Sequence, residues 1–177
     1  MRQLKADITT LFSDRDLIAE LYEEALNKML TQSLDEIIDE NGDVMITEIN
    51  EEVDAILNTT VKEAYEMIPE IHYPMVTIAE IDNSIAHKYW NGTEFATALA
   101  YQFTINCDQS IVHTANQNVR ILQYIIDKYL QGERYYCFRR IAFSSPIPSV
   151  DDPNIRTGVL RYDCNLVPEE NTIYRRY

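Results

Sequence analysis

Glycine and proline are scarce in this chain of 177 residues, which has four of the first and six of the second. Glycine-rich loops that cradle phosphate, such as Gly-x-x-x-x-Gly-Lys and Gly-x-Gly-x-x-Gly, do not occur. The Gly-x-Ser-x-Gly turn that carries the nucleophile of α/β-hydrolases is also missing. These absences argue against the common nucleotide-binding and hydrolase sites.

Cysteine and histidine are equally sparse, with three of each. The cysteines, at positions 107, 137 and 164, are widely spaced, and we expect buried, reduced thiols. The histidines, at positions 72, 87 and 113, form no His-x-x-x-His pair. Asp151-Asp152 follows a proline-rich stretch, where a simple turn is a better interpretation than a weak cation site. We therefore expect no metal, no cofactor and no enzymatic activity.

Basic residues are outnumbered, because 15 Lys and Arg stand against 29 Asp and Glu, for a net charge of −14. Such a balance excludes a broad basic surface for nucleic acid or anionic lipid. The longest apolar runs are too short to span a bilayer, and no apolar targeting segment follows Met1. We expect a soluble product made in the cytosol.

The acidic residues are unevenly distributed along the chain. Residues 1–70 hold 18 acids and 5 bases, whereas residues 71–177 hold 11 acids and 10 bases. This asymmetry predicts two parts with different surroundings. An acidic helix face is ordinarily solvated, and an acidic docking face is the alternative.

Helical periodicity dominates the first part. Apolar residues at three-and-four spacing predict one amphipathic helix, or two abutting ones, over Ser13–Asn41. Ser13 and Asp16 resemble a capping box, and Gly42 lies where a helix C-cap belongs. A second helix is predicted after Thr47 as its N-cap. Residues 61–67 fit either a continuation of this helix or a strand.

Strand patterns dominate the second part. Strands are predicted at 73–81, 95–107, 135–143 and 155–166, with a helix at His113–Leu130 and a loop or hairpin link at 83–93. This order predicts an α+β fold in which a small, mostly antiparallel sheet packs against a helix. We place an N-terminal acidic helical extension at residues 1–45 and the sheet domain at 46–177.

The candidate functional residues are those of a protein interface, because Tyr and Arg are favoured there. Arg134, Arg139 and Arg140 stand among aromatic residues, and a proline-rich turn follows at 145–156. Aromatic packing in the core is the plainer explanation of the same cluster. The candidate residues are Arg134, Arg139, Arg140, Ile147, Asp151, Asp152, Arg156, Arg175 and Arg176.

Residues 46–177 resemble the tail-terminator and tail-completion proteins of long-tailed bacteriophages. The likeness rests on the order of the elements and on weak local similarity, which runs through YPMVTIAEIDN from Tyr73, ALAYQFTINC from Ala98, the helix at 116–130, CFRR from Cys137, SPIP from Ser145 and IRTGVLRYDCNL from Ile155. The resemblance implies a structural virion protein, assembled in the host cytoplasm, that forms a hexameric ring on the head-proximal end of the tail tube.

The partners that the resemblance implies are further copies of the chain, the tail-tube protein and the head–tail connector protein. DNA would pass through the ring without specific binding, which an acidic wall favours. Residues 1–45 depart from the family by their extra helical segment. The alternative function is a cytosolic acidic adaptor or inhibitor that acts through its N-terminal helices and binds a basic partner in a salt-dependent way.

Overall fold

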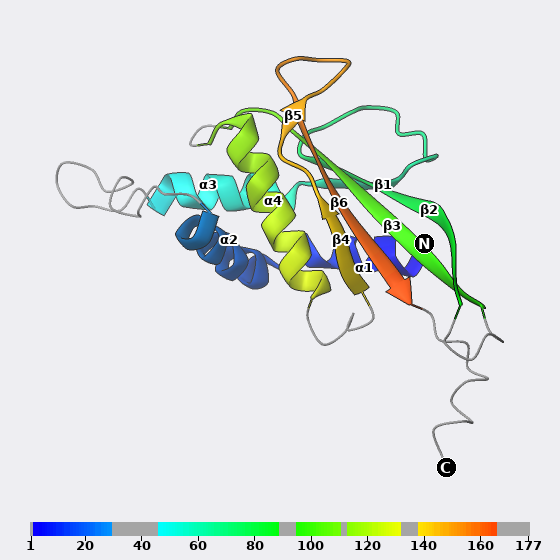
Figure 1. Ribbon diagram of the computed structural model, residues 1–177. Coiled ribbons are helices and arrows are strands. Elements are labelled where there is room, and N and C mark those ends of the chain that lie inside the picture. The colour runs from blue at the N-terminus through cyan, green and yellow to red at the C-terminus, as the bar shows by residue number, and fades with distance from the viewer. Residues whose placement is uncertain (1, 30–45, 89–94, 111–112, 132–137, 166–177) are drawn as a thin grey trace, which may run out of the picture.

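A computed structural model of the chain describes residues 2–29, 46–88, 95–110, 113–131 and 138–165. Three helices come first, followed by three strands, a fourth helix and three further strands (Figure 1). The elements are α1 (Arg2–Leu11), α2 (Arg15–Met29), α3 (Ile46–Leu57), β1 (Thr60–Glu63), β2 (Met75–Lys88), β3 (Phe95–Cys107), α4 (Ala115–Leu130), β4 (Phe138–Phe143), β5 (Ile147–Pro148) and β6 (Arg156–Asn165).

Helix α2 begins where a side-chain oxygen accepts a hydrogen bond from an otherwise unpaired backbone N–H. Asp14 caps α2, because its Oδ1 accepts a hydrogen bond from the Leu17 N–H at 3.1 Å. The predicted Ser13 cap is therefore wrong by one residue; the Ser13 hydroxyl donates instead to the Thr10 carbonyl at 2.7 Å. Helix α1 was not predicted. The proposed C-cap at Gly42 lies outside the described residues.

Helix α3 starts at Ile46, so the proposed cap Thr47 lies inside the helix. It ends at Leu57, where Asn58 donates from its backbone N–H to the Asp54 carbonyl at 3.2 Å. In the ambiguous stretch 61–67, residues 61–63 belong to strand β1 (Thr60–Glu63), as one of the two interpretations expected, and residues 64–67 lie in neither a helix nor a strand.

The strands form one sheet in the order β1-β2-β3-β6-β4, and β5 pairs with β6 beside β4. The α+β class is confirmed, but the sheet is mixed rather than mostly antiparallel. β1 runs parallel to β2, because the segment 64–74 carries the chain back before β2 begins, while the other described pairings are antiparallel. The proposed link at 83–93 is in part strand, since β2 continues to Lys88 and pairs with Phe95 at the start of β3.

Helix α4 has a complete N-terminal cap and lies close against strand β6 of the sheet. Thr114 and Gln117 form a capping box, and the predicted helix His113–Leu130 is confirmed from its third residue, Ala115, onward. Gly158 of β6 lies under this helix, and a Cβ there would meet the Val119 Cγ1 at 2.4 Å. The strand therefore uses glycine because nothing larger fits beneath α4.

The core lies between the helices and one face of the sheet. Alternate residues of the central strands, such as Ile78, Phe103 and Leu160, point to this face and are fully buried. Helices α1 and α2 belong to the same cluster, with Ile8 and Ile18 fully buried in it. The predicted boundary at residue 45 lies outside the described residues and stays a prediction. The described part of the proposed extension nonetheless packs into the core of the sheet domain.

Candidate functional site

One exposed apolar loop follows edge strand β4. We call residues 143–154 the β4–β6 lip. Phe143 is 47% exposed, Ile147 59% and Val150 100%. Phe143 lies opposite Leu160 and Ile147 lies opposite Thr157, so these two side chains project from different faces of the same edge of the sheet.

The β4–β6 lip is held in shape by hydrogen bonds at its base and tip. The Ser144 N–H donates to the Val159 carbonyl at 3.0 Å, and the Ser144 carbonyl accepts from the buried Gln123 Nε2 at 3.0 Å. At the tip, the Asp152 Oδ1 accepts from the Asn154 N–H at 2.8 Å. The apolar side chains therefore stand on a loop whose backbone is already ordered.

A second exposed apolar loop follows edge strand β1. We call residues 64–72 the β1–β2 lip. Tyr65 is 99% exposed, Met67 97% and Ile71 59%. The Ala64 N–H donates to the Ile78 carbonyl at 2.9 Å, and the Lys5 ammonium pairs with the Glu66 carboxylate at 2.5 Å. This loop too is anchored to the strand beside it and to α1.

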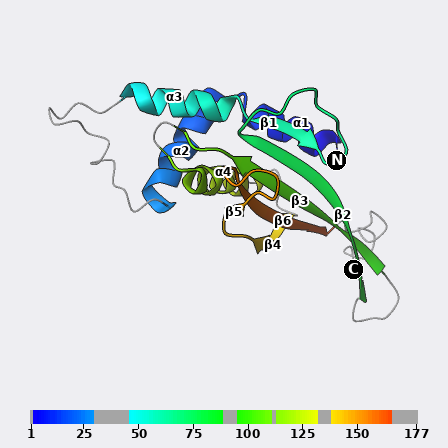
Figure 2. The same ribbon diagram turned by 90° about the horizontal axis from the view of Figure 1, so that it is seen from above.

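The two lips lie at opposite edges of the sheet. Four strand-to-strand spacings separate β1 from β4, a distance of about 19 Å at ordinary spacing. Seen from above, α1 and β1 follow one side of the molecule, while β4 and β5 follow the other (Figure 2). One subunit therefore presents exposed apolar residues at both edges of its sheet.

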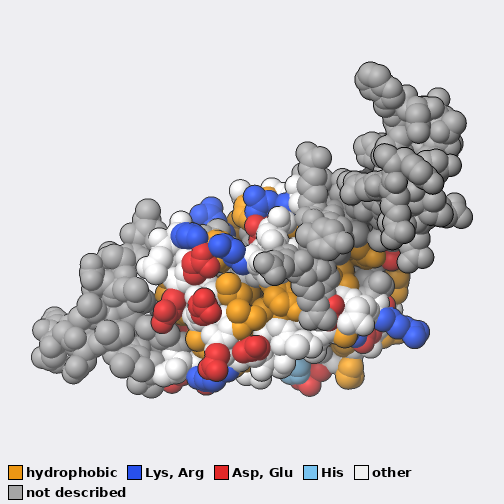
Figure 3. All heavy atoms as spheres, turned by 90° about the horizontal axis from the view of Figure 1, so that it is seen from below, with side chains coloured by type: hydrophobic (Ala, Val, Ile, Leu, Met, Phe, Trp, Pro, Cys, Tyr) orange, Lys and Arg blue, Asp and Glu red, His pale blue; other side chains and the backbone are white. Residues whose placement is uncertain are grey.

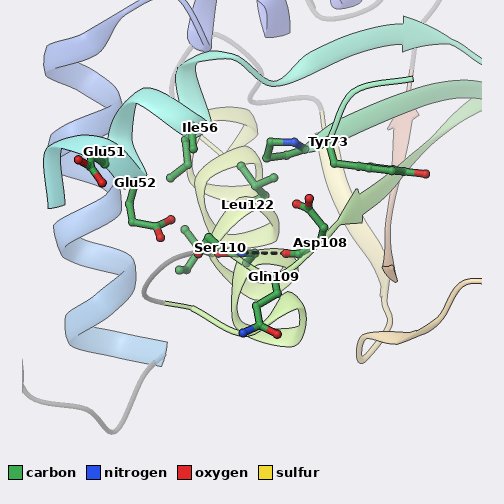
Figure 4. Close-up of a pocket in the computed structure, with 12 residues that line it drawn as sticks. Glu51, Glu52, Ile56, Tyr73, Asp108, Gln109, Ser110 and Leu122 are labelled. Atoms are coloured by element: carbon green, nitrogen blue, oxygen red, sulfur yellow. Dashed lines mark hydrogen bonds between the residues drawn. The ribbon is translucent and has the colours of Figure 1, made fainter. Parts of the chain in front are cut away.

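A cavity of about 270 Å³ lies between α3, the segment before β2, the segment after β3 and the first half of α4. Glu52 points into it from α3, and Asp108 faces it from the end of β3 (Figure 4). Ile56 and Leu122 supply an apolar floor. This combination of carboxylates and apolar wall suits a small cationic group.

A buried polar contact lies near this cavity. The Tyr22 hydroxyl and the His113 Nε2 are 2.7 Å apart, and the His113 Nδ1 has no hydrogen-bond partner. Burial raises the pKa of Tyr22 and lowers that of His113, and the Glu52 carboxylate opposes the second shift. The neutral imidazole is therefore the form that the fold holds.

A group of charges links α2 to α4 at the surface. Glu24 pairs with Lys128 at 2.9 Å and with Lys28, and these two ammonium groups, Lys128 first, lower the pKa of Glu24 to about 2. Both lysines lie within 6 Å of the centre of the Tyr124 ring.

In the view from below, hydrophobic side chains gather at the centre of the face with acidic and basic ones beside them (Figure 3).

The structure places five of the sequence candidates at one edge of the sheet. Ile147 and the pair Asp151-Asp152 lie on the β4–β6 lip, and Arg156 begins β6 beside it, where its Nη1 donates to the Pro153 carbonyl at 2.5 Å. Arg140 lies on β4, with its Nη1 2.6 Å from the Asp127 Oδ2.

The remaining candidates are less well placed. Arg139 lies on β4, but its side chain is outside the described part of the structure, as are Arg134, Arg175 and Arg176 altogether. Sequence reasoning missed the whole β1–β2 lip. The available signal was a group of apolar residues around Pro69 and before Pro74, namely Met67, Ile68 and Ile71. Neither helical nor strand periodicity explains their spacing.

Comparison with known proteins adds no assignment: the chain matches no protein family, no curated protein and no solved structure. Within the described ranges, no three His, Cys, Asp or Glu side chains converge as metal ligands would. Among the helices that the structure describes, none has the length and hydropathy to cross a membrane.

Proposed function

We propose that this protein is a structural subunit of a tailed-phage neck, which assembles as a ring, caps the tail tube and joins it to the head connector. The observation that carries the proposal is the pair of apolar lips at opposite edges of the sheet. A ring needs a head-to-tail contact, in which each subunit offers two different surfaces. A protein that acts through a single patch needs only one.

The nature of the lips also favours assembly over catalysis. Tyr65, Met67 and Val150 are almost fully exposed on loops that hydrogen bonds hold in place. Because the backbone of these loops is already ordered, little backbone entropy is lost when a partner covers them. Under this proposal the protein is found in the virion and has no enzymatic activity.

The alternative function, an acidic adaptor, has weaker support. Several acids of the N-terminal part already pair with bases of the same chain: Asp54 with Arg15, Glu24 with Lys28 and Lys128, and Glu66 with Lys5. Each such pair reduces the charge available to a basic partner. The acidic excess is therefore partly used within the fold.

Electron microscopy of tails assembled with and without this protein tests the proposal. We expect tail tubes of uncontrolled length when the protein is missing and tubes of one length when it is restored. Tails of normal length that lack heads would assign it to the joining step alone. Complete virions formed without it would overturn the proposal.

A further inference from the structure

We propose that the cavity between α3 and α4 binds one organic cation with an aliphatic stem, the chemistry of an arginine or lysine side chain. The cavity has a volume of about 270 Å³. Pockets for drug-sized ligands hold about 300–1,000 Å³, so this one suits a single long side chain or a small amine better than a nucleotide. The inference goes beyond the proposed function and does not depend on it.

The charge of the cavity walls selects a cation. Of the twelve described residues that line the cavity, three are acidic, Glu51, Glu52 and Asp108, and none is basic. Within the described part of the chain, neither the Glu51 nor the Asp108 carboxylate forms an ion pair, whereas other acids such as Glu66 do. A cation in the cavity would supply the opposite charge that these two carboxylates lack.

Two of the carboxylates reach the cavity from different elements. Glu52 is only 4% exposed and points into the cavity from α3, and Asp108 faces it from the end of β3 (Figure 4). Water screens a partly enclosed carboxylate less than one at the open surface, so its attraction for a cation is stronger there.

The apolar floor distinguishes an organic cation from a metal ion. Ile56, Ile121 and Leu122 line the cavity and are buried. The aliphatic stem of an arginine or lysine side chain can lie on such a floor while its charged end reaches a carboxylate. A metal ion gains nothing from the floor, and no metal-ligand group of three His, Cys, Asp or Glu is present among the residues that the structure describes.

Hydrogen bonds hold the cavity in shape before any ligand binds. The Asn118 Nδ2 donates to the Asp108 carbonyl at 2.9 Å, which Figure 4 draws as a dashed line. The Ser110 N–H donates to the His113 carbonyl at 3.0 Å. These bonds fix residues 108–110 beside the start of α4, so a ligand would enter a site whose walls are already ordered.

Titrations of the full-length chain, followed by proton–nitrogen NMR correlation spectra, test the inference. The first probe is the tripeptide Gly-Arg-Gly with both ends blocked. Its comparator has citrulline in place of arginine, which keeps the shape of the side chain and removes its charge. We expect saturable binding of the arginine peptide, with shifts confined to residues 51–56, 108–110 and 118–122, and binding of the citrulline peptide at least tenfold weaker.

Variants then locate the site. Glu52→Gln and Asp108→Asn each remove one charge from the walls, and Ala55→Leu fills part of the cavity, so each should weaken binding about tenfold. Glu80→Gln is the matched control, because it removes the same charge from an exposed position about 20 Å along β2 from Pro74. Circular dichroism melts verify that the variants fold. Asp108 is exposed, so its variant decides the test if Glu52→Gln is unstable.

Butylguanidine, a free cation with the same charged group and stem, identifies the source of the ligand. Binding of both the peptide and butylguanidine would assign the cavity to a side chain of another protein, and binding of butylguanidine alone would assign it to a free amine or guanidine.

Other outcomes overturn the inference. It is wrong if neither cation binds saturably, if the citrulline peptide binds as tightly as the arginine peptide, or if the three cavity variants bind as tightly as Glu80→Gln. The tail-length experiment is independent of these readings, so an empty cavity would leave the proposed function standing.

Discussion

At the scale of single residues, β6 and α4 come into close contact at Gly158. A Cβ at this position would lie 2.4 Å from the Val119 Cγ1 and 2.7 Å from the Gln123 Nε2. Val119 is fully buried and cannot move aside without disturbing its neighbours. The distance between α4 and the sheet is therefore as short as it is because Gly158 has no side chain.

Gly158→Ala should lower the free energy of unfolding by about 1–3 kcal/mol, because the added methyl group forces α4 away from the sheet. Urea denaturation followed by circular dichroism measures the change. Arg161→Ala, three residues further along the same strand and exposed, is the control and should stay within about 0.5 kcal/mol. An alanine variant as stable as the unmodified chain would mean that the helix shifts freely.

Residue-scale features of this kind could be predicted only in part. The alternation of β6 was readable, with Gly158, Leu160 and Tyr162 on one face. The need for glycine was not, because it depends on which helix crosses the strand and how closely. The Tyr22 to His113 contact spans 91 positions, and periodicity carries no information at that separation.

At the scale of elements, this buried contact joins α2 to the residue just before the cap of α4. It consists of two polar side chains enclosed by core residues, with His113 only 3% exposed. A hydrogen bond in such surroundings is worth more when made, and its loss leaves an unsatisfied group. The orientation of α2 on α4 should therefore depend on the protonation of His113.

Stability should fall as the pH drops below about 6.5, the pKa of a free imidazole. Burial lowers the pKa of His113 in the folded protein, so the unfolded chain binds the proton first and unfolding gains up to about 1.4 kcal/mol per pH unit. The loss continues until the pH reaches the lowered pKa. Urea denaturation from pH 7.5 to 5 measures it.

His113→Gln should remove this part of the pH dependence, whereas His72→Gln should retain it because His72 is exposed. Equal slopes for the unmodified chain and for His113→Gln would contradict the argument, and would mean that the folded protein accepts the proton as readily as the unfolded chain does.

The helices and strands differ in how well the sequence predicted them. β3 and α4 were predicted almost to the residue, because β3 alternates in a central position and α4 has one apolar stripe with a strong cap. Helix α1 was missed although Leu4, Ile8 and Leu11 share one face, since only ten residues carry the pattern. Strand β1 has only four residues, all half-buried, and so short a segment does not distinguish helical from strand periodicity.

At the scale of the whole molecule, the sequence pointed to two parts and the structure shows a shared core. Nine buried side chains of residues 4–26 belong to the cluster that also holds the sheet and α4. The acidic excess led to the predicted boundary at residue 45, because the charge pattern describes only the outer faces of these helices. The inner faces, which decide whether they belong to the domain, follow from packing that charge does not describe.

Deletion of residues 1–29 should therefore unfold the rest of the chain. Nine core side chains of this segment are lost, and the apolar surface that they cover on α3, α4 and β1 becomes exposed to water, a change that exceeds the narrow margin of stability of an ordinary domain. We expect the shortened chain to lose its cooperative urea transition and to bind a hydrophobic dye. Thr9→Ala and Thr10→Ala, on the exposed side of α1, serve as controls and should cost little. If the shortened chain still unfolds cooperatively, the prediction is wrong and the first helices are an appendage. The acidic segment would then act independently of the sheet.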